Sequence, residues 1–174
     1  GSVSTRGAEF AFIATPSDHF RWFNSVAWND SQYDDDYVNG AYINPVDGSN
    51  VVRSGGKQVV DTPKLLFASE VEYRLGDFTA KLGTKYTGNR YYTYNNDAGV
   101  DEFWLWNGGL AWEKKDLGWA HRLRVAFDAT NLFDEKYIAT LGSNGFRDSD
   151  PNGTFATLLA GSPRQLFLSV DLEF

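Results

Sequence analysis

The sequence contains no cysteine and no methionine among its 174 residues. Disulfide bonds, thiolate metal sites and thiol chemistry are therefore excluded. It also has no run of the roughly 18 to 20 apolar residues that a membrane-spanning helix needs, which excludes a helical membrane protein. Basic residues are outnumbered, with 16 Lys and Arg against 23 Asp and Glu, and the net charge of −7 argues against a nucleic-acid partner.

Apolar and aromatic side chains are abundant, at 42% and 16% of the residues. The mean hydropathy is nevertheless −0.41, a value that a soluble domain would also have. Mean hydropathy does not separate the two classes, because only alternate residues of a membrane barrel strand meet lipid.

The dominant local pattern is the two-residue alternation of β-strands, and no segment has a convincing helical period. Near the end of the chain, Leu168, Val170 and Leu172 fall on one face while Ser169 and Asp171 fall on the other. We therefore predict an all-β fold of antiparallel meander strands. The seven expected strands are residues 5–14, 20–30, 65–75, 78–89, 101–113, 121–137 and 163–174.

The connections between these strands alternate in length. Short turns lie at one end of the expected sheet, and the loops 31–64, 90–100 and 138–162 lie at the other. Outer-membrane barrels have this arrangement, with short periplasmic turns and long outer loops. In the first long loop, Gly55 and Gly56 can supply the positive φ angles of a tight turn, so we predict a small hairpin within residues 50–61.

Alternation alone does not decide which way the apolar face points, because a soluble lipocalin-like barrel would turn it inward. A narrow barrel would then have to pack many large rings, whereas a lipid-facing surface accepts them near its borders. We therefore favour a transmembrane barrel segment and keep a soluble ligand-binding barrel as the alternative. Four tryptophans are interpreted as two aromatic girdles at the membrane borders: Trp104, Trp106, Trp112 and Trp119.

The last quarter of the chain carries a motif. Residues 129–146 read ATNLFDEKYIATLGSNGF, and residues 162–174 read SPRQLFLSVDLEF. These segments resemble the C-terminal end of the barrel in TonB-dependent outer-membrane transporters, where Asn-Leu-Phe-Asp precedes a long outer loop and Pro-Arg opens a last strand that stops on Phe. The matching residues are Asn131, Leu132, Phe133, Asp134, Lys136, Tyr137, Pro163 and Arg164.

The resemblance implies a place in the bacterial outer membrane and a part in importing a scarce large solute, such as siderophore-bound iron, cobalamin or a glycan. The segment would supply barrel wall, outer loops that select the ligand and the C-terminal assembly strand. Family transporters have 22 strands around an N-terminal plug. Residues 3–174 are therefore expected to be the C-terminal portion of such a barrel, without its plug or earlier strands. Gly1 and Ser2 are expected to be the scar of a cleaved tag.

The partners that the resemblance implies are outer-membrane lipid, lipopolysaccharide and the barrel assembly machinery. That machinery would recognise the terminal strand through Val170, Leu172 and Phe174. TonB would be contacted only through the absent N-terminal part. We expect no cofactor and no enzyme activity, because His19 and His121 have no serine near them in a nucleophile setting; a small outer-membrane enzyme is the remaining alternative.

Two loop segments are candidate binding sites. The first offers aromatic rings and amides that suit a sugar or a chelated metal complex, although tyrosine is also typical of an interface belt. Its residues are Arg90, Tyr91, Tyr92, Tyr94, Asn95 and Asn96. The second resembles the start of a calcium loop at Asp148, Asp150 and Asn152, but Leu159 stands where a glutamate is needed, so a solvated turn is the simpler interpretation.

Overall fold

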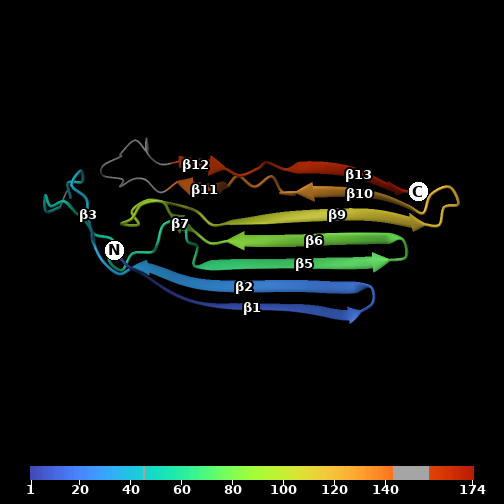
Figure 1. Ribbon diagram of the computed structural model, residues 1–174, viewed down its shortest axis with the longest axis horizontal. Coiled ribbons are helices and arrows are strands. Elements are labelled where there is room, and N and C mark those ends of the chain that lie inside the picture. Colours follow the sequence, from blue (N-terminus) through green and yellow to red (C-terminus); the bar gives the residue numbers. More distant parts are fainter. Residues whose placement is uncertain (45, 143–156) are drawn as a thin grey trace.

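The computed structural model describes residues 1–44, 46–142 and 157–174. A single large antiparallel sheet dominates it, and its seven strands lie side by side in chain order, which confirms the predicted all-β meander (Figure 1). Within the described residues, no helix is long and apolar enough to cross a membrane. The strands of the main sheet are β1 (Val3–Ser17), β2 (Phe20–Tyr33), β5 (Leu65–Leu75), β6 (Phe78–Thr87), β9 (Phe103–Lys115), β10 (Arg122–Thr130) and β13 (Gln165–Glu173).

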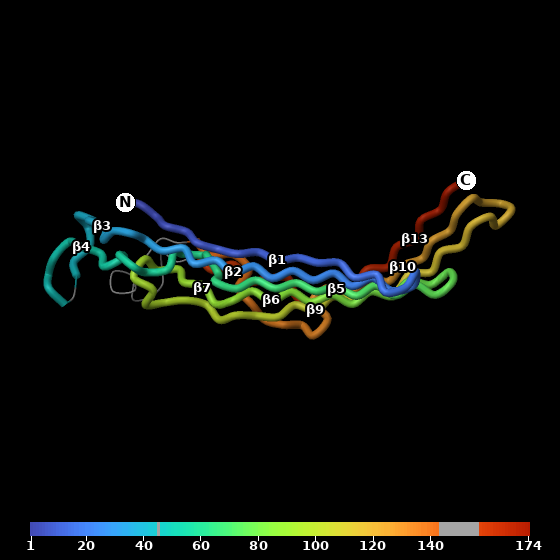
Figure 2. Tube along the Cα trace, turned by 90° about the horizontal axis from the view of Figure 1, so that it is seen from below, coloured from blue at the N-terminus to red at the C-terminus, as the bar shows by residue number. Residues whose placement is uncertain are grey.

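The main sheet is open, since β1 and β13 form its two edges and each pairs on one side only. The sheet is curved rather than flat (Figure 2). Neighbouring strands follow one another through short turns at one end and long loops at the other. The seven strands do not close on themselves.

Strand register sorts the side chains onto two faces. Phe10, Val26, Phe67, Tyr86 and Trp104 stand opposite one another in successive strands and therefore share a face. We call this the apolar face and the opposite side the polar face. Further members of the apolar face are Phe12, Trp22, Trp28, Val71, Phe78, Leu82, Leu110, Trp112, Val125, Phe127, Leu168 and Val170.

The apolar face is largely uncovered. Phe10 is 62% exposed, Leu110 63% and Leu168 72%. A water-soluble monomer rarely exposes so broad a contiguous apolar surface, so this side of the sheet requires an apolar environment.

Each long loop carries a two-stranded ladder of its own. We name the loops A (residues 34–64), B (residues 88–102) and C (residues 131–164). Loop A contains β3 (Tyr37–Val38) and β4 (Val51–Val52), and loop B contains β7 (Arg90–Tyr91) and β8 (Gly99–Val100). Loop C contains β11 (Ile138–Gly142) and β12 (Thr157–Ala160).

Two sequence predictions about these loops are wrong. The hairpin around Gly55 and Gly56 does not form: Gly56 has a φ of +73°, but Val51–Val52 pairs with Tyr37–Val38, and the residues after the turn pair with the end of β2. The predicted strand 121–137 ends at Thr130. Asn131 and Asp134, at φ values of +49° and +56°, leave the extended conformation there.

Candidate functional site

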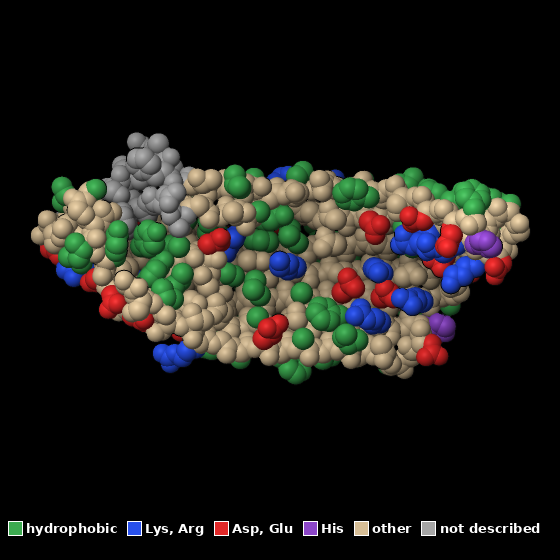
Figure 3. Space-filling model, in the orientation of Figure 1, with side chains coloured by type: hydrophobic (Ala, Val, Ile, Leu, Met, Phe, Trp, Pro, Cys, Tyr) green, Lys and Arg blue, Asp and Glu red, His purple; other side chains and the backbone are tan. Residues whose placement is uncertain are grey.

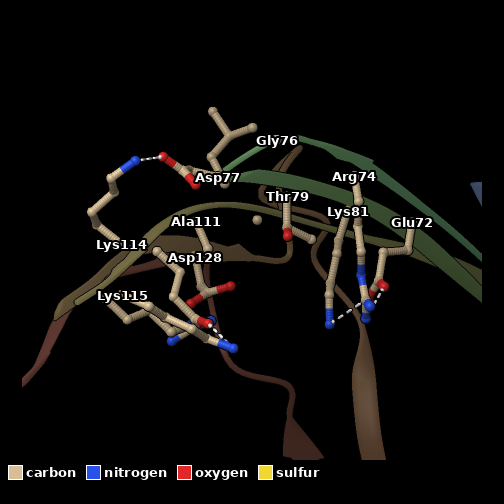
Figure 4. Close-up of a pocket in the computed structure, with 14 residues that line it drawn as sticks. Glu72, Arg74, Gly76, Asp77, Thr79, Lys81, Ala111, Lys114, Lys115 and Asp128 are labelled. Carbon is tan, nitrogen blue, oxygen red and sulfur yellow. Dashed lines mark hydrogen bonds and ion pairs between the residues drawn. The ribbon is translucent and has the colours of Figure 1, made fainter. Parts of the chain in front are cut away.

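The polar face holds a dense set of ion pairs near the short turns, where the space-filling view shows the charged side chains gathered (Figure 3). Glu72 is the most buried of these groups, at 5% exposure, and accepts from Arg74 at 2.6 Å and from Lys81 at 3.0 Å. Figure 4 shows both cations reaching toward Glu72. Further pairs near the short turns are Arg21–Glu70, Lys114–Asp77, Lys115–Glu113, Arg122–Glu113, Arg122–Glu173 and Arg124–Asp171.

A hollow of about 670 Å³ lies among these charges. Its walls come from β5, β6, β9 and β10, and its lining includes Asp77, Thr79 and Asp128 (Figure 4). Both cations and carboxylates line it, and the pairs among them compensate one another's charge. The arrangement makes a hydrophilic wall that can face water or another polar protein surface.

The loop end of the sheet contains the segment predicted to bind a ligand. Arg90 is only 5% exposed and donates to Oδ1 of Asp61 at 2.9 Å and to the carbonyl oxygen of Ala139 at 3.1 Å. Its guanidinium carbon lies 5.8 Å from the ring centroid of Phe103. In this arrangement Arg90 is occupied by contacts within the protein.

The other residues of the predicted segment fall into two groups: some make contacts within the protein, and two tyrosines stay partly exposed. The side chain of Asn96 pairs with both backbone groups of Gln58, accepting at 2.7 Å and donating at 2.9 Å. The Tyr94 ring lies 5.8 Å from the Tyr33 ring, and Asn95 donates to Asp97 at 3.1 Å. Asn96, together with Tyr94, which also packs against Tyr42 and Val52, docks loop B on loop A, whereas the Asn95–Asp97 bond lies within loop B. Tyr91 and Tyr92 are partly exposed, and a ligand-binding role for them stays a prediction.

The Asn-Leu-Phe-Asp motif forms the base of loop C. Asn131 is 5% exposed, and its amide donates to the carbonyl oxygens of Glu135 at 2.9 Å and Ser162 at 3.0 Å. Its Oδ1 accepts from the amide of Glu135 at 2.8 Å, and its own backbone amide donates to Asn107 at 3.0 Å. One side chain thus joins the end of β10 to the segment that enters β13.

Asp134 completes this base. Its Oδ1 accepts from the backbone amide of Arg164 at 2.9 Å, and its Oδ2 accepts from Lys136 at 2.9 Å. The Arg164 amide, followed by Lys136, holds the pKa of Asp134 below its usual value. Pro163 lies between the two attachment points, Ser162 and Arg164. The motif that the sequence analysis singled out is therefore a clamp that brings β10 and β13 together.

Aromatic residues of the motif pack around this clamp. Phe133 lies 6.2 Å from Trp106 between ring centroids, and the Leu132 amide donates to the Trp106 carbonyl at 2.7 Å. Tyr137 lies 4.4 Å from Phe103. The backbone amide of Gly161 donates to the Tyr137 carbonyl at 2.8 Å.

The proposed girdle residues differ in position. Trp104 and Trp106 lie on the apolar face toward the loop end of β9, and Trp112 lies on the same face toward the short turns. Trp119 lies in the turn before β10 and is 61% exposed. Contact of these rings with a membrane border stays a prediction.

The residues predicted to form an assembly signal lie on or next to the edge strand β13. Val170 and Leu172 are 62% and 42% exposed on the apolar face, and Phe174 is 79% exposed. Recognition of this strand by another protein stays a prediction. The weak metal candidates Asp148, Asp150 and Asn152 lie outside the described residues.

Three residues that hold the loops or the base of loop C could not be recognised from the sequence around them. Asp61, Gln58 and Asn107 appear in the sequence as ordinary polar loop or strand residues, and their partners lie 29, 38 and 24 positions away. A pairing across that separation becomes visible only when the loops are placed in space.

The chain was compared with known proteins by sequence and by structure, and the structural comparison found similar folds. No family model matches the chain, and no curated protein matches it in sequence. Among solved structures, the siderophore receptor PiuA from Acinetobacter baumannii superposes with a TM-score of 0.76 at 13% identity, over 99% of this chain and 22% of that one. The ferric yersiniabactin uptake receptor FyuA from Yersinia pestis gives a TM-score of 0.71 at 15% identity, over 99% and 24%.

The ferric preacinetobactin receptor BauA from Acinetobacter baumannii gives a TM-score of 0.70 at 21% identity, over 98% of this chain and 22% of that one. The chain spans less than a quarter of the length of each of these three receptors. The match covers nearly all of this chain, including the sheet and the described loops. The chain therefore has the fold of a part of the β-barrel of TonB-dependent receptors, as its C-terminal motif predicted.

Proposed function

We propose that this chain is part of the wall of an outer-membrane receptor that takes up a scarce large solute in a TonB-dependent way. The observation that carries the proposal is the division of the sheet into a continuous exposed apolar face and a charged polar face. A lipid bilayer would cover the first, and water or a polar domain in the barrel lumen would meet the second.

The two ends of the sheet would have different roles. Loops A, B and C stand together at one end and would form part of the outer mouth, where Tyr91 and Tyr92 are candidates for solute contact. The short turns would lie on the periplasmic side. An iron-bound siderophore is the favoured solute, because PiuA, FyuA and BauA are described as receptors for a siderophore or a named ferric complex.

The terminal strand would direct assembly. An edge strand with unpaired backbone groups is a template for strand addition to another sheet. The exposed face of β13, which ends on Phe174, would give that recognition its side-chain specificity.

Cell fractionation tests the proposal. An antibody against residues 120–174 is used to probe outer-membrane and soluble fractions of the native cell, with and without boiling of the sample. The proposal predicts an outer-membrane band several times larger than 19.5 kDa that shifts on heating, as folded barrels do. A soluble band near 19.5 kDa would overturn it and make a soluble ligand-binding barrel the better account.

A further inference from the structure

Arg90 is the residue at which the three long loops meet. It opens β7 in loop B, and its Nη1 donates both to Asp61 of loop A at 2.9 Å and to the carbonyl of Ala139 in loop C at 3.1 Å. Its Nη2 donates to the carbonyl of Ile138, also in loop C. One guanidinium therefore joins segments that lie 29 and 48 positions away in the sequence.

Arg90 is buried, so its charge depends on the partners that the three loops provide. The residue is 5% exposed, and a buried charge is costly unless it is paired and hydrogen-bonded. Asp61 supplies the opposite charge, and the carbonyls of Ala139 and Ile138 in β11 each accept one Nη hydrogen bond. The buried Nε has no hydrogen-bond partner among the described residues. Because these partners belong to loops A and C, Arg90 keeps its charge partner and its two carbonyl acceptors only while both loops stay in position beside β7.

Loops A and B are also joined without Arg90. Asn96 holds both backbone groups of Gln58, and the amide of Asp61 donates to the carbonyl of Tyr91 at 2.9 Å. Within the described residues, the hydrogen bonds that tie β11 of loop C to loops A and B come from Arg90. The consequences of losing Arg90 should therefore differ between loop pairs.

We propose that Arg90 is a positioning residue that fixes the β11–β12 ladder of loop C against loops A and B, so that the three loops present one joint surface. The planar fork of arginine is essential to this role, because it places several donors toward partners in two different loops at once. The inference does not depend on the proposed function, since it concerns contacts among loops of this chain alone.

The absence of native cysteine allows a direct test by spin labelling. One double-cysteine variant, Lys57→Cys with Thr140→Cys, reports the distance from loop A to loop C. A second, Lys57→Cys with Asn89→Cys, reports the distance from loop A to loop B. All three positions are exposed, and distances are measured by pulsed electron paramagnetic resonance on the full chain.

Arg90→Ala is expected to broaden the A-to-C distance distribution at least about twofold, as expected when a loop loses its anchoring contacts, and to leave the A-to-B distribution unchanged. Arg90→Lys should also broaden it, because one ammonium group does not reproduce the fork. The control is Arg53→Ala, which removes an arginine whose two partners, Asp36 and Asp47, both lie within loop A. It should leave the A-to-C distribution unchanged.

Two results would overturn the proposal. An A-to-C distribution that stays as narrow in Arg90→Ala as in the parent would mean that other contacts position loop C. Equal broadening of both distributions would mean that Arg90 supports the loops in general rather than loop C in particular. A soluble fractionation result would remove the proposed function but would leave this measurement and its interpretation intact.

Discussion

Tyr137 lies over Gly161 so closely that the ring leaves no room for a Cβ atom there. The same two residues are joined by the hydrogen bond from the Gly161 amide to the Tyr137 carbonyl, 2.8 Å long. Glycine at this position lets the two arms of loop C approach where they leave the β11–β12 ladder.

Gly161→Ala is therefore expected to force Tyr137 out of place and to destabilise the folded state by about 1–3 kcal/mol, as overpacking does. The measurement is the temperature at which the folded band disappears on unboiled gels. Gly40→Ala is the matched control, because a Cβ at Gly40 meets nothing within 4 Å. Equal melting of the two variants would contradict this account of Gly161.

The clamp at Asn131 predicts a graded series of variants. Asn131→Ala loses three side-chain hydrogen bonds and must still adopt a φ of +49°, so a loss of about 2–4 kcal/mol is expected. Asn131→Gly relieves the backbone strain but not the lost bonds, and should be milder than alanine. If glycine is no milder than alanine in the same melting measurement, the backbone part of the explanation is wrong.

A charge on the apolar face should be far more damaging than the same charge on the polar face. Leu168→Arg places a cation on the apolar face of β13, which costs about 2–4 kcal/mol near the middle of a bilayer. Ser169→Arg, one residue along the same strand, points to the polar face and should have little effect. The comparison is the amount of heat-shifting band in outer membranes, and similar losses for both variants would argue against a lipid-facing apolar face.

Loop A contains two carboxylates, Asp36 and Asp47, that should be protonated only in strong acid. The Ser49 side chain and amide, followed by Arg53, hold the pKa of Asp47 at about 2, and the Gly55 amide, followed by Arg53, lowers the pKa of Asp36. Because these pKa values are lowered on folding, their stabilising contribution is present above about pH 3.8 and is lost as the pH falls toward 2.

A fluorophore on loop A, attached through Gly40→Cys both in the parent and in an Arg53→Ala background, tests this prediction. The parent should keep its low probe mobility down to about pH 4 and lose it below that value. Arg53→Ala should shift the transition to higher pH, because both carboxylates then lose their cation. A transition near neutral pH in the parent would contradict the assignment. Added salt should weaken the effect, since these groups are exposed.

The strands and their faces were predictable because alternation is a local signal. Phe67, Val71 and Tyr73 stand against Glu70 and Glu72 in the sequence, and the same division appears in the sheet. The error at the end of β10 arose because the apolar residues around Asn131 continue a strand-like pattern. The left-handed conformation of that asparagine depends on hydrogen bonds to Glu135 and Ser162, and the second of these partners is remote in sequence.

The loop site was less predictable. Arg90 was expected to face a ligand because exposed aromatic loops often bind one, and nothing near it in the sequence points to Asp61 or to the carbonyls of β11. Backbone carbonyls carry no sequence signal at all, so a buried arginine that uses them is recognised only in three dimensions. The failed hairpin at Gly55 has the same origin: Gly56 takes the positive φ that was predicted and Gly55 does not, and Val51 and Val52 pair with β3, which is remote in sequence.

The central claim is that lipid covers the apolar face. It is tested most directly by single cysteines placed one at a time at positions 106 to 111 of β9, each labelled with a fluorophore in outer membranes. The account predicts that a lipid-soluble quencher acts on the labels at even positions, which share the apolar face with Trp104, and spares those at odd positions. Uniform quenching, or quenching of the odd positions instead, would contradict it.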